Sequence, residues 1–200
     1  MHIAYLVVSK MDVYKTIISR RTIRKFKQES IGESLLEKIL ESARLAPSAS
    51  NLQPCEFIVV NEPKLRDELF NALKWAGYIA PKGNPGKDER PLTYIIVITD
   101  TKKSSWGIVD ASSAIENMIL TAWSEGVASC WLGAIDKEKI RQIFKVPDNY
   151  SVEFVLALGF PEESSVIEEC KGDVKYWKDE QGTLHVPKRS LKQVVHKNKF

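Results

Sequence analysis

The sequence predicts an α/β or α+β sandwich in which helices cover both faces of one β-sheet. Helical and strand-like patterns alternate along the chain, and the run at residues 94–99 is continuously apolar and β-branched, as is typical of a strand buried on both faces. The chain has 200 residues, of which 44% are hydrophobic, which suits one domain with its own core or with a core completed by a second subunit. No internal repeat or linker divides residues 1–200.

The first part of the chain predicts three helices. Asp12 can cap a short helix that leads into a basic cluster. Ser30 and Glu33 have the spacing of a capping box, and apolar residues recur at helical spacing over residues 31–43. Pro63 suits the first turn of a third helix.

The longest predicted helix spans residues 108–125 and is apolar almost all round, so it lies at the centre of its domain or at a subunit interface. Residues 76–91 contain three Pro and three Gly among mixed charges, and they predict a long irregular segment that could act as a lid or a partner arm. The other predicted elements are strands at residues 56–60, 94–99, 128–134 and 153–159 and a helix that begins at Asp136.

Composition excludes several classes of protein. The 29 basic and 26 acidic residues give a net charge of +3, which is too near neutral for a typical nucleic-acid-binding protein. No apolar run is long enough to span a bilayer, and residues 1–10 lack the pattern of a signal peptide. That stretch forms either an extra first strand or an extension upstream of Met11. We therefore expect a cytoplasmic protein without a nucleic-acid or membrane partner.

The cysteines and histidines predict no metal site. Cys55, Cys130 and Cys170 form no CxxC pair and have no histidine at metal-ligand spacing, so we expect reduced thiols. His185 and the other two histidines are isolated, and we interpret each as a surface or structural residue.

A dense basic cluster is the most informative feature of the chain. Residues 19–27 contain five cationic side chains around the hydroxyl of Thr22, and arginine forks bind phosphate through paired charge-assisted hydrogen bonds. A second basic cluster, Lys188-Arg189, lies near the other end of the chain. If both clusters bind one dianion, the fold must bring the two ends together. The alternatives are a solvated charged face and a loose nucleic-acid contact.

The chain lacks the motifs of nucleotide-binding and acyl-transfer enzymes. It has no GxGxxG after a strand and no GxxxxGK[ST] loop, and Ser48 and Ser50 are not flanked as in GxSxG. A bound cofactor is therefore expected to carry the chemistry, and we assign no catalytic side chain.

Four segments together resemble the FMN-dependent nitroreductase family in order and spacing. They are the basic cluster and the segments at residues 46–54, 126–134 and 187–191, and the resemblance runs from about Asp12 to the last residue. It implies an α+β three-layer sandwich whose mixed, mostly antiparallel sheet is flanked by helices. It also implies a homodimer of the domain-swapped type, in which the long helix lies at the interface and the C-terminal segment of one subunit extends over the other.

The implied phosphate site uses both basic clusters. Four residues match the family's Arg-Arg-Ser-x-Arg pattern, namely Arg20, Arg21, Thr22 and Arg24. The first is implied to hold the FMN phosphate together with Lys188 and Arg189, and the last to approach the pyrimidine edge of the flavin. A positive charge at that edge makes the flavin easier to reduce. Without the resemblance, Arg24 is equally well read as an exposed cation at a helix end.

Two further segments are implied to contact the flavin. A loop supplied by the second subunit matches Pro47, Ser48, Ala49 and Asn51, and backbone amides that face flavin N5 and O4 match Leu132, Gly133 and Ala134. Ala49 replaces the second Ser of the family pattern and Cys55 replaces its Trp, which alters the wall of the substrate pocket. By themselves, Asn51 and Gly133 also fit a turn residue and a packing residue.

The resemblance implies an FMN-dependent NAD(P)H oxidoreductase with ping-pong exchange. NADH or NADPH passes a hydride to flavin N5 and leaves, and an electron-poor nitro compound, quinone or similar small molecule takes its place. A non-catalytic protein that stores or senses FMN and a small basic nucleic-acid-binding protein are the alternatives. Purified protein that is yellow and bleaches with NADH or NADPH would favour the enzyme.

Overall fold

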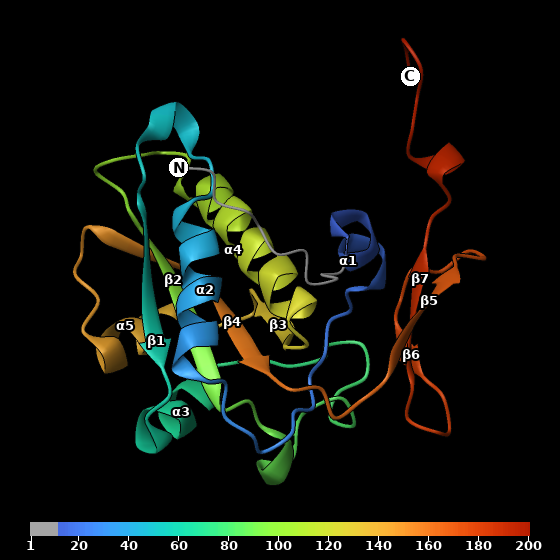
Figure 1. Cartoon of the computed structure of the whole chain (residues 1–200), viewed down its shortest axis with the longest axis horizontal. Coiled ribbons are helices and arrows are strands. Elements are labelled where there is room, and N and C mark those ends of the chain that lie inside the picture. The colour runs from blue at the N-terminus through green and yellow to red at the C-terminus, as the bar shows by residue number, and fades with distance from the viewer. Residues whose placement is uncertain (1–11) are drawn as a thin grey trace, which may run out of the picture.

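The computed structural model describes residues 12–200, so the interpretation of residues 1–10 lies outside the described residues. Figure 1 shows helices packed around a central sheet, with a smaller sheet and the C-terminal tail to one side. The helices are α1 (Val13–Ser19), α2 (Glu33–Arg44), α3 (Pro63–Phe70), α4 (Gly107–Ser124) and α5 (Lys137–Phe144). The strands are β1 (Cys55–Val60), β2 (Thr93–Asp100), β3 (Ala128–Leu132), β4 (Tyr150–Gly159), β5 (Ser165–Glu169), β6 (Trp177–Lys178) and β7 (Leu184–Lys188).

The central sheet has the strand order β1-β2-β4-β3, and each neighbouring pair is antiparallel. Thr22 adds a parallel bridge to Ser129 of β3, so the pairing is mixed but mostly antiparallel, as expected. β2 is buried along its whole length, because it lies between β1 and β4 and its two faces pack into two separate cores. The apolar run at residues 94–99 therefore correctly predicted a strand buried on both faces.

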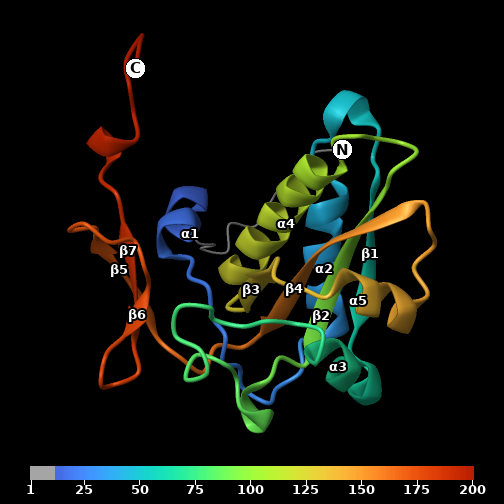
Figure 2. The same cartoon turned by 180° about the vertical axis from the view of Figure 1, so that it is seen from behind.

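Alternate residues of the central strands face two separate cores. Ile95 and Val97 pack with α2 and α4 on one face, whereas Ile96 and Ile98 pack on the other face with residues of α3 and α5. Figures 1 and 2 show α2 and α4 side by side from opposite directions. The arrangement confirms the predicted α+β layers. Among residues 12–200 no helix, α4 included, is long and apolar enough to cross a membrane.

The predicted helix starts are confirmed at Pro63 and Asp136 and wrong at Ser30. Pro63 lies in the first turn of α3, and the Asp136 side chain accepts an N–H group of the first turn of α5. α2 instead begins at Glu33 after Gly32, and no side chain caps it. The N-cap residue of α2 is Gly32, so Ser30 lies two residues before the capping position. From there its side chain does not cap the N–H groups of the first turn.

A second sheet follows β4 and was not predicted. Its strand order is β5-β7-β6, with β5 parallel and β6 antiparallel to β7. These strands are short and mix charged with apolar residues, so they lack the run that marks a buried strand. Figures 1 and 2 both place this arm sheet (β5, β6 and β7) beside α1, and the tail after β7 runs away from the body.

Residues 76–91 form the predicted irregular segment, which consists mainly of turns. Its one regular stretch is the short 3-10 turn η2 (Lys87–Glu89). The carbonyl of Glu89 accepts the N–H of Phe26 at 2.9 Å, so the end of this segment is tied to the basic cluster. At its start, the ring of Tyr78 lies 5.0 Å from that of Tyr176, next to the arm sheet.

Candidate functional site

The basic cluster lies in an extended segment that is fixed on several sides. Ile23 donates its N–H to the carbonyl of Ser129 in β3 at 3.0 Å, and Lys27 donates to the carbonyl of Phe160 at 2.9 Å. Ile23 and Phe26 are 2% and 0% exposed, so their side chains anchor the segment in the core. Because the apolar residues point inward, the polar residues between them are left to face solvent or a cavity.

One cavity of about 230 Å³ brings the two basic clusters together. Arg20, Thr22 and Arg24 line it from the extended segment, and Lys188 lines it from the end of β7. Its other lining residues are Arg21, Ile167, Tyr176, Leu184 and Val186. Lys188 therefore brings the second basic cluster to the first, as a shared dianion requires, whereas Arg189 does not line this cavity. Both residues are exposed.

The basic cavity, as we call this space, contains cationic groups that have no anionic partner among residues 12–200. Among residues 12–200, Nη1 of Arg24 and Nε of Arg21 are buried and have no hydrogen-bond partner. The guanidinium of Arg24 lies over the ring of Tyr176, 4.8 Å from its centre, in a cation–π contact. A buried donor left without an acceptor costs about 1 to 3 kcal/mol, so this arrangement favours an anionic or strongly accepting ligand.

Two cations of the basic cluster are used within the chain. Arg21 donates from Nη1 to the carbonyls of Ile18 and Arg20, at 2.9 and 2.6 Å, and so closes the end of α1. Burial and the neighbouring Arg20 lower the pKa of the Arg21 guanidinium. Lys25 pairs with Glu89 at 2.6 Å and lines a different cavity. Arg20 and Arg24 are therefore the arginines best placed for a ligand.

The predicted flavin loop lies away from the basic cavity. It forms the short 3-10 turn η1 (Ala49–Asn51), which Figure 1 shows at the opposite end of the body from the arm sheet. Ser50 and Asn51 have positive φ angles of 49° and 55°, consistent with the turn-forming character expected of this loop. Within one chain, Pro47, Ser48, Ala49 and Asn51 are not brought together with Arg20 and Arg24.

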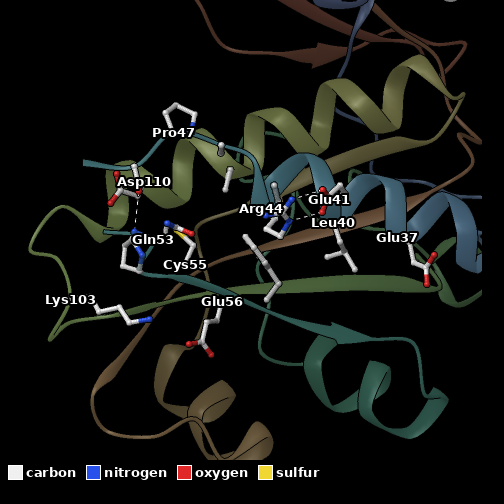
Figure 3. Close-up of a pocket in the computed structure, with 16 residues that line it drawn as sticks. Glu37, Leu40, Glu41, Arg44, Pro47, Gln53, Cys55, Glu56, Lys103 and Asp110 are labelled. Atoms are coloured by element: carbon white, nitrogen blue, oxygen red, sulfur yellow. Dashed lines mark hydrogen bonds and ion pairs between the residues drawn. The ribbon is translucent and has the colours of Figure 1, made fainter. Parts of the chain in front are cut away.

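A second and larger cavity, of about 800 Å³, lies beside this loop. Pro47 and Ser48 line it together with residues of α2, β1 and α4. Figure 3 shows Asp110 and Cys55 at one end of this cavity and Glu37 at the other. Asp110 is 5% exposed and accepts the N–H of Ala49 at 2.9 Å through Oδ1, while its Oδ2 has no partner among the described residues.

The third predicted segment lies at the end of β3. Leu132 is buried, whereas Gly133 and Ala134 are exposed. The carbonyl of Ala134 accepts the N–H of Lys74 at 3.0 Å, so the backbone there is held in place. The segment therefore presents exposed, ordered backbone next to β3, which also carries the bridge to Thr22.

Two of the thiols, Cys55 and Cys130, are not activated as nucleophiles. Burial, with smaller contributions from Asp110 and Glu153, raises the pKa of Cys55 to about 11. Burial likewise raises the pKa of Cys130 to about 11. Both groups are protonated at neutral pH, and Cys130 is buried as expected.

Comparison with known sequences decides the family. The profile described as "Nitroreductase family" matches residues 17–160. The chain belongs to the nitroreductase family. It is 34% identical over 160 residues to a protein of Archaeoglobus fulgidus that is provisionally named an NADH dehydrogenase/NAD(P)H nitroreductase, and the match covers 76% of this chain and 87% of that protein. This chain is accordingly a nitroreductase-family oxidoreductase.

Solved structures support the same fold for this nitroreductase-family chain. An FMN-dependent nitroreductase from Clostridium difficile R20291 has 29% identity and a TM-score of 0.67, covering 92% of this chain and 98% of that one. The NADPH:FMN oxidoreductase of Vibrio harveyi, solved with NAD+, has 22% identity and a TM-score of 0.70, covering 94% and 77% of the two chains. At that identity the second structure is evidence for the fold alone.

Three residues near the candidate sites of this nitroreductase-family chain were not predicted from the sequence. Tyr176 and Glu163 lie in charged stretches that resemble an ordinary surface, so no local pattern distinguished them. Asp110 could have been noticed, because it is an acidic residue on the apolar stripe of the predicted helix, one position before Ala111. Such a residue needs a hydrogen-bonding partner when it is buried.

Proposed function

We propose that this nitroreductase is an FMN-dependent NAD(P)H oxidoreductase that reduces an electron-poor small molecule, such as a nitro compound or a quinone. The observation that carries the proposal is the basic cavity, where Arg24 has a buried donor without a partner and Lys188 joins the first basic cluster. The 29%-identical relative named an FMN-dependent nitroreductase supports the cofactor, and the 34%-identical Archaeoglobus fulgidus relative, named for NAD(P)H, supports the donor.

The basic cavity suits a phosphate dianion and an adjoining flavin edge. Arg20 and Lys188 would hold the phosphate through charge-assisted hydrogen bonds, and Thr22 would add a neutral donor. Arg189, which follows Lys188 and is exposed, could contribute if a ligand extends beyond the cavity. Arg24 would face the pyrimidine edge of the flavin, held there by its contact with Tyr176.

The protein groups supply binding and electrostatics rather than covalent chemistry. Bound FMN would supply the hydride transfer, first from NADH or NADPH and then to the electron-poor acceptor. The charge of Arg24 would stabilise the negative charge that develops on reduction, since a fixed cation in a partly buried site is weakly screened. The backbone of Leu132, Gly133 and Ala134 would donate hydrogen bonds to the flavin away from Arg24. The protonated thiol of Cys55 would not take part in the chemistry.

We also propose a homodimer in which each FMN site is completed by the second copy. In one chain the loop at residues 47–51 lies away from the basic cavity, so only another copy could bring it there. Three surfaces carry large exposed apolar side chains: α1, the start of α4 and the tail. They include Val13, Tyr14, Ile17, Trp106, Ile108, Leu191 and Val194. Apolar surface on this scale is typical of an interface.

The experiment is an anaerobic titration of the purified protein after loading with FMN. Bleaching of the flavin absorbance by NADH or NADPH, followed by its return when a nitroarene or quinone is added, is the expected result. A protein that binds FMN but does not bleach would be a storage or sensing protein. A protein that retains no more FMN than riboflavin would contradict the proposal, because it would not bind the FMN phosphate specifically.

A further inference from the structure

A buried carboxylate contacts the backbone of the basic segment, the extended stretch at residues 20–27. It does not line the basic cavity. The side chain of Glu163, which follows β4, is 4% exposed. Its Oε1 accepts the backbone N–H of Arg24 at 2.5 Å and that of Lys25 at 3.3 Å. Its Oε2 pairs with Nζ of Lys178 in β6 at 2.6 Å. Glu163 therefore joins the basic segment to the arm sheet.

Two contacts from Glu163 and the arm-sheet region fix the position of Arg24. Glu163 fixes its backbone N–H, and the ring of Tyr176 lies against its guanidinium at 4.8 Å. Tyr176 is two residues before Lys178, so both contacts depend on the same part of the arm sheet. The Arg24 side chain is therefore fixed in position, although its Nη1 has no hydrogen-bond partner among the described residues.

Charge alone does not explain a carboxylate at this position. A negative group close to a cationic cavity would weaken anion binding if its charge acted freely. Here the charge is balanced by Lys178 and by two backbone donors, so its remaining effect on the cavity is small while its geometric effect is retained.

We propose that Glu163 is a positioning residue that keeps Arg24 in place for the ligand of the basic cavity. The inference rests on the proposed function only in taking FMN as that ligand. Without the acceptor, the buried N–H groups of Arg24 and Lys25 lose their partner, and the segment samples other arrangements. The ligand then binds only the fraction of molecules that have Arg24 in place, which weakens the apparent affinity.

The test compares three substitutions in the full chain. Glu163→Ala removes the acceptor and the charge, whereas Glu163→Gln removes the charge and keeps an acceptor oxygen. Glu162→Gln is the matched control, because it removes the same charge from the exposed neighbouring residue. Glu163→Met, which fills similar space without oxygens, replaces the alanine variant if that variant does not fold.

The first measurement needs no FMN. Hydrogen exchange of the Arg24 and Lys25 amides should accelerate by about tenfold or more in Glu163→Ala and stay near the parent rate in Glu163→Gln and Glu162→Gln. Equal protection in the parent and in Glu163→Ala would overturn the proposal. If the parent proves not to bind FMN, the proposed function fails while this comparison still tests Glu163.

The second measurement is the dissociation constant for FMN. We expect about tenfold weaker binding in Glu163→Ala and a change of less than about threefold in Glu163→Gln. A residue that acted only through its charge would give the opposite result, with both variants binding FMN more tightly than the parent and alike. That outcome, or unchanged binding in all variants of a parent that binds FMN, would overturn the positioning role.

Discussion

At the scale of single residues, the basic cavity depends on which cations are left unpaired. Arg21 and Lys25 belong to the same cluster as Arg20 and Arg24 but are used in contacts within the chain. Composition alone cannot separate these roles, because all four side chains carry the same charge. Their contacts do separate them, because Arg21 lines the cavity but is bonded to the end of α1, whereas Lys25 lies outside the cavity. Two predictions use this difference.

Arg20→Ala and Lys188→Ala should each weaken FMN binding, because each removes a cation that lines the basic cavity. Loss of a charge-assisted donor to a phosphate is worth on the order of 2 kcal/mol. Fluorescence titration with FMN measures the effect, and Lys25→Ala is the control, since Lys25 pairs with Glu89 outside the cavity. Riboflavin lacks the phosphate, so its binding should barely change. Equal losses for riboflavin and FMN would remove these residues from the phosphate site.

Arg24→Gln should leave the protein folded and able to bind FMN but should lower the flavin midpoint potential. Gln can still donate a hydrogen bond, whereas the positive charge that favours the reduced flavin is lost. A change of about 1.4 kcal/mol would shift the corresponding equilibrium about tenfold. Spectroelectrochemical titration measures it, and reduction by NAD(P)H should be slower. An unchanged potential would mean that Arg24 lies outside the flavin site.

At the scale of structural elements, polar contacts stabilise two parts of the fold that lie outside the apolar cores, the loop at residues 47–51 and the arm sheet. One is the bond from the Ala49 N–H to Asp110, which ties the loop at residues 47–51 to α4. The other is His185 of β7, which lies between Glu168 of β5 and Asp179, at 3.1 and 3.2 Å, and stacks on Trp177 of β6. The sequence left a surface or a structural role open for His185, and these contacts favour the structural one.

Asp110→Ala should destabilise the protein by about 1 to 3 kcal/mol, because the Ala49 N–H loses its acceptor and a small cavity forms. Asp110→Asn retains an acceptor oxygen and should be less destabilised. Denaturant unfolding of the three proteins measures the difference. If the alanine and asparagine variants are equally stable, the hydrogen bond does not hold the loop.

The arm sheet should be most stable at mildly acidic pH. The hydrogen bond with Asp179 raises the pKa of His185, burial partly opposes it, and Glu168 adds to the rise. A raised folded-state pKa means that this stabilisation is complete below the unfolded value of about 6.5 and is lost as pH rises through the higher folded value. The carboxylates have lowered pKa values, so their contribution is lost as pH falls toward and below about 4.

Hydrogen exchange of the β6 and β7 amides, compared on the two sides of the His185 titration and corrected for the intrinsic rate, measures this effect. Protection should decline on the alkaline side in the parent and should be independent of pH over that range in His185→Asn. His196→Asn, in the tail outside the sheet, should behave as the parent. The same decline in His185→Asn would show that another group is responsible.

At the scale of the whole molecule, the proposed second copy of the chain would cover exposed apolar surface. Only Thr16 of α1 is buried, while Tyr14 and Ile17 of the same helix are 67% and 49% exposed. A helix with its apolar residues in solvent would be unstable unless another surface covered it. The tail, which extends from the body in Figure 2, is exposed in the same way.

Light scattering should therefore report the mass of two chains for the FMN-loaded protein. Tyr14→Lys places a charge in the predicted interface and should shift the equilibrium toward the monomer, with release of FMN. Lys15→Gln is the control on the same helix, because Lys15 is already exposed and polar. A monomer that retains FMN would contradict both the dimer and the role given to the loop at residues 47–51.

Much of the fold could be predicted from the sequence because it rests on local patterns. The helical period over residues 31–43 and 108–125 and the apolar run at residues 94–99 identify α2, α4 and β2 directly. The arm sheet could not be predicted in this way. Its strands are short, and their pairing depends on contacts with distant segments. The hydrophobic pattern within each strand does not determine it.

The sequence by itself determined that the chain carries a dense basic cluster and the motifs of the nitroreductase family. Only the tertiary structure decided that Lys188 joins this cluster, that the loop at residues 47–51 lies elsewhere in the same chain, and that Glu163 holds Arg24 from 139 positions away. The physical reason is the range of each effect. Charge clusters and periodicity depend on residues that are neighbours in the sequence. A cavity depends on residues that are far apart in the sequence and are brought together by the strand order of the sheets.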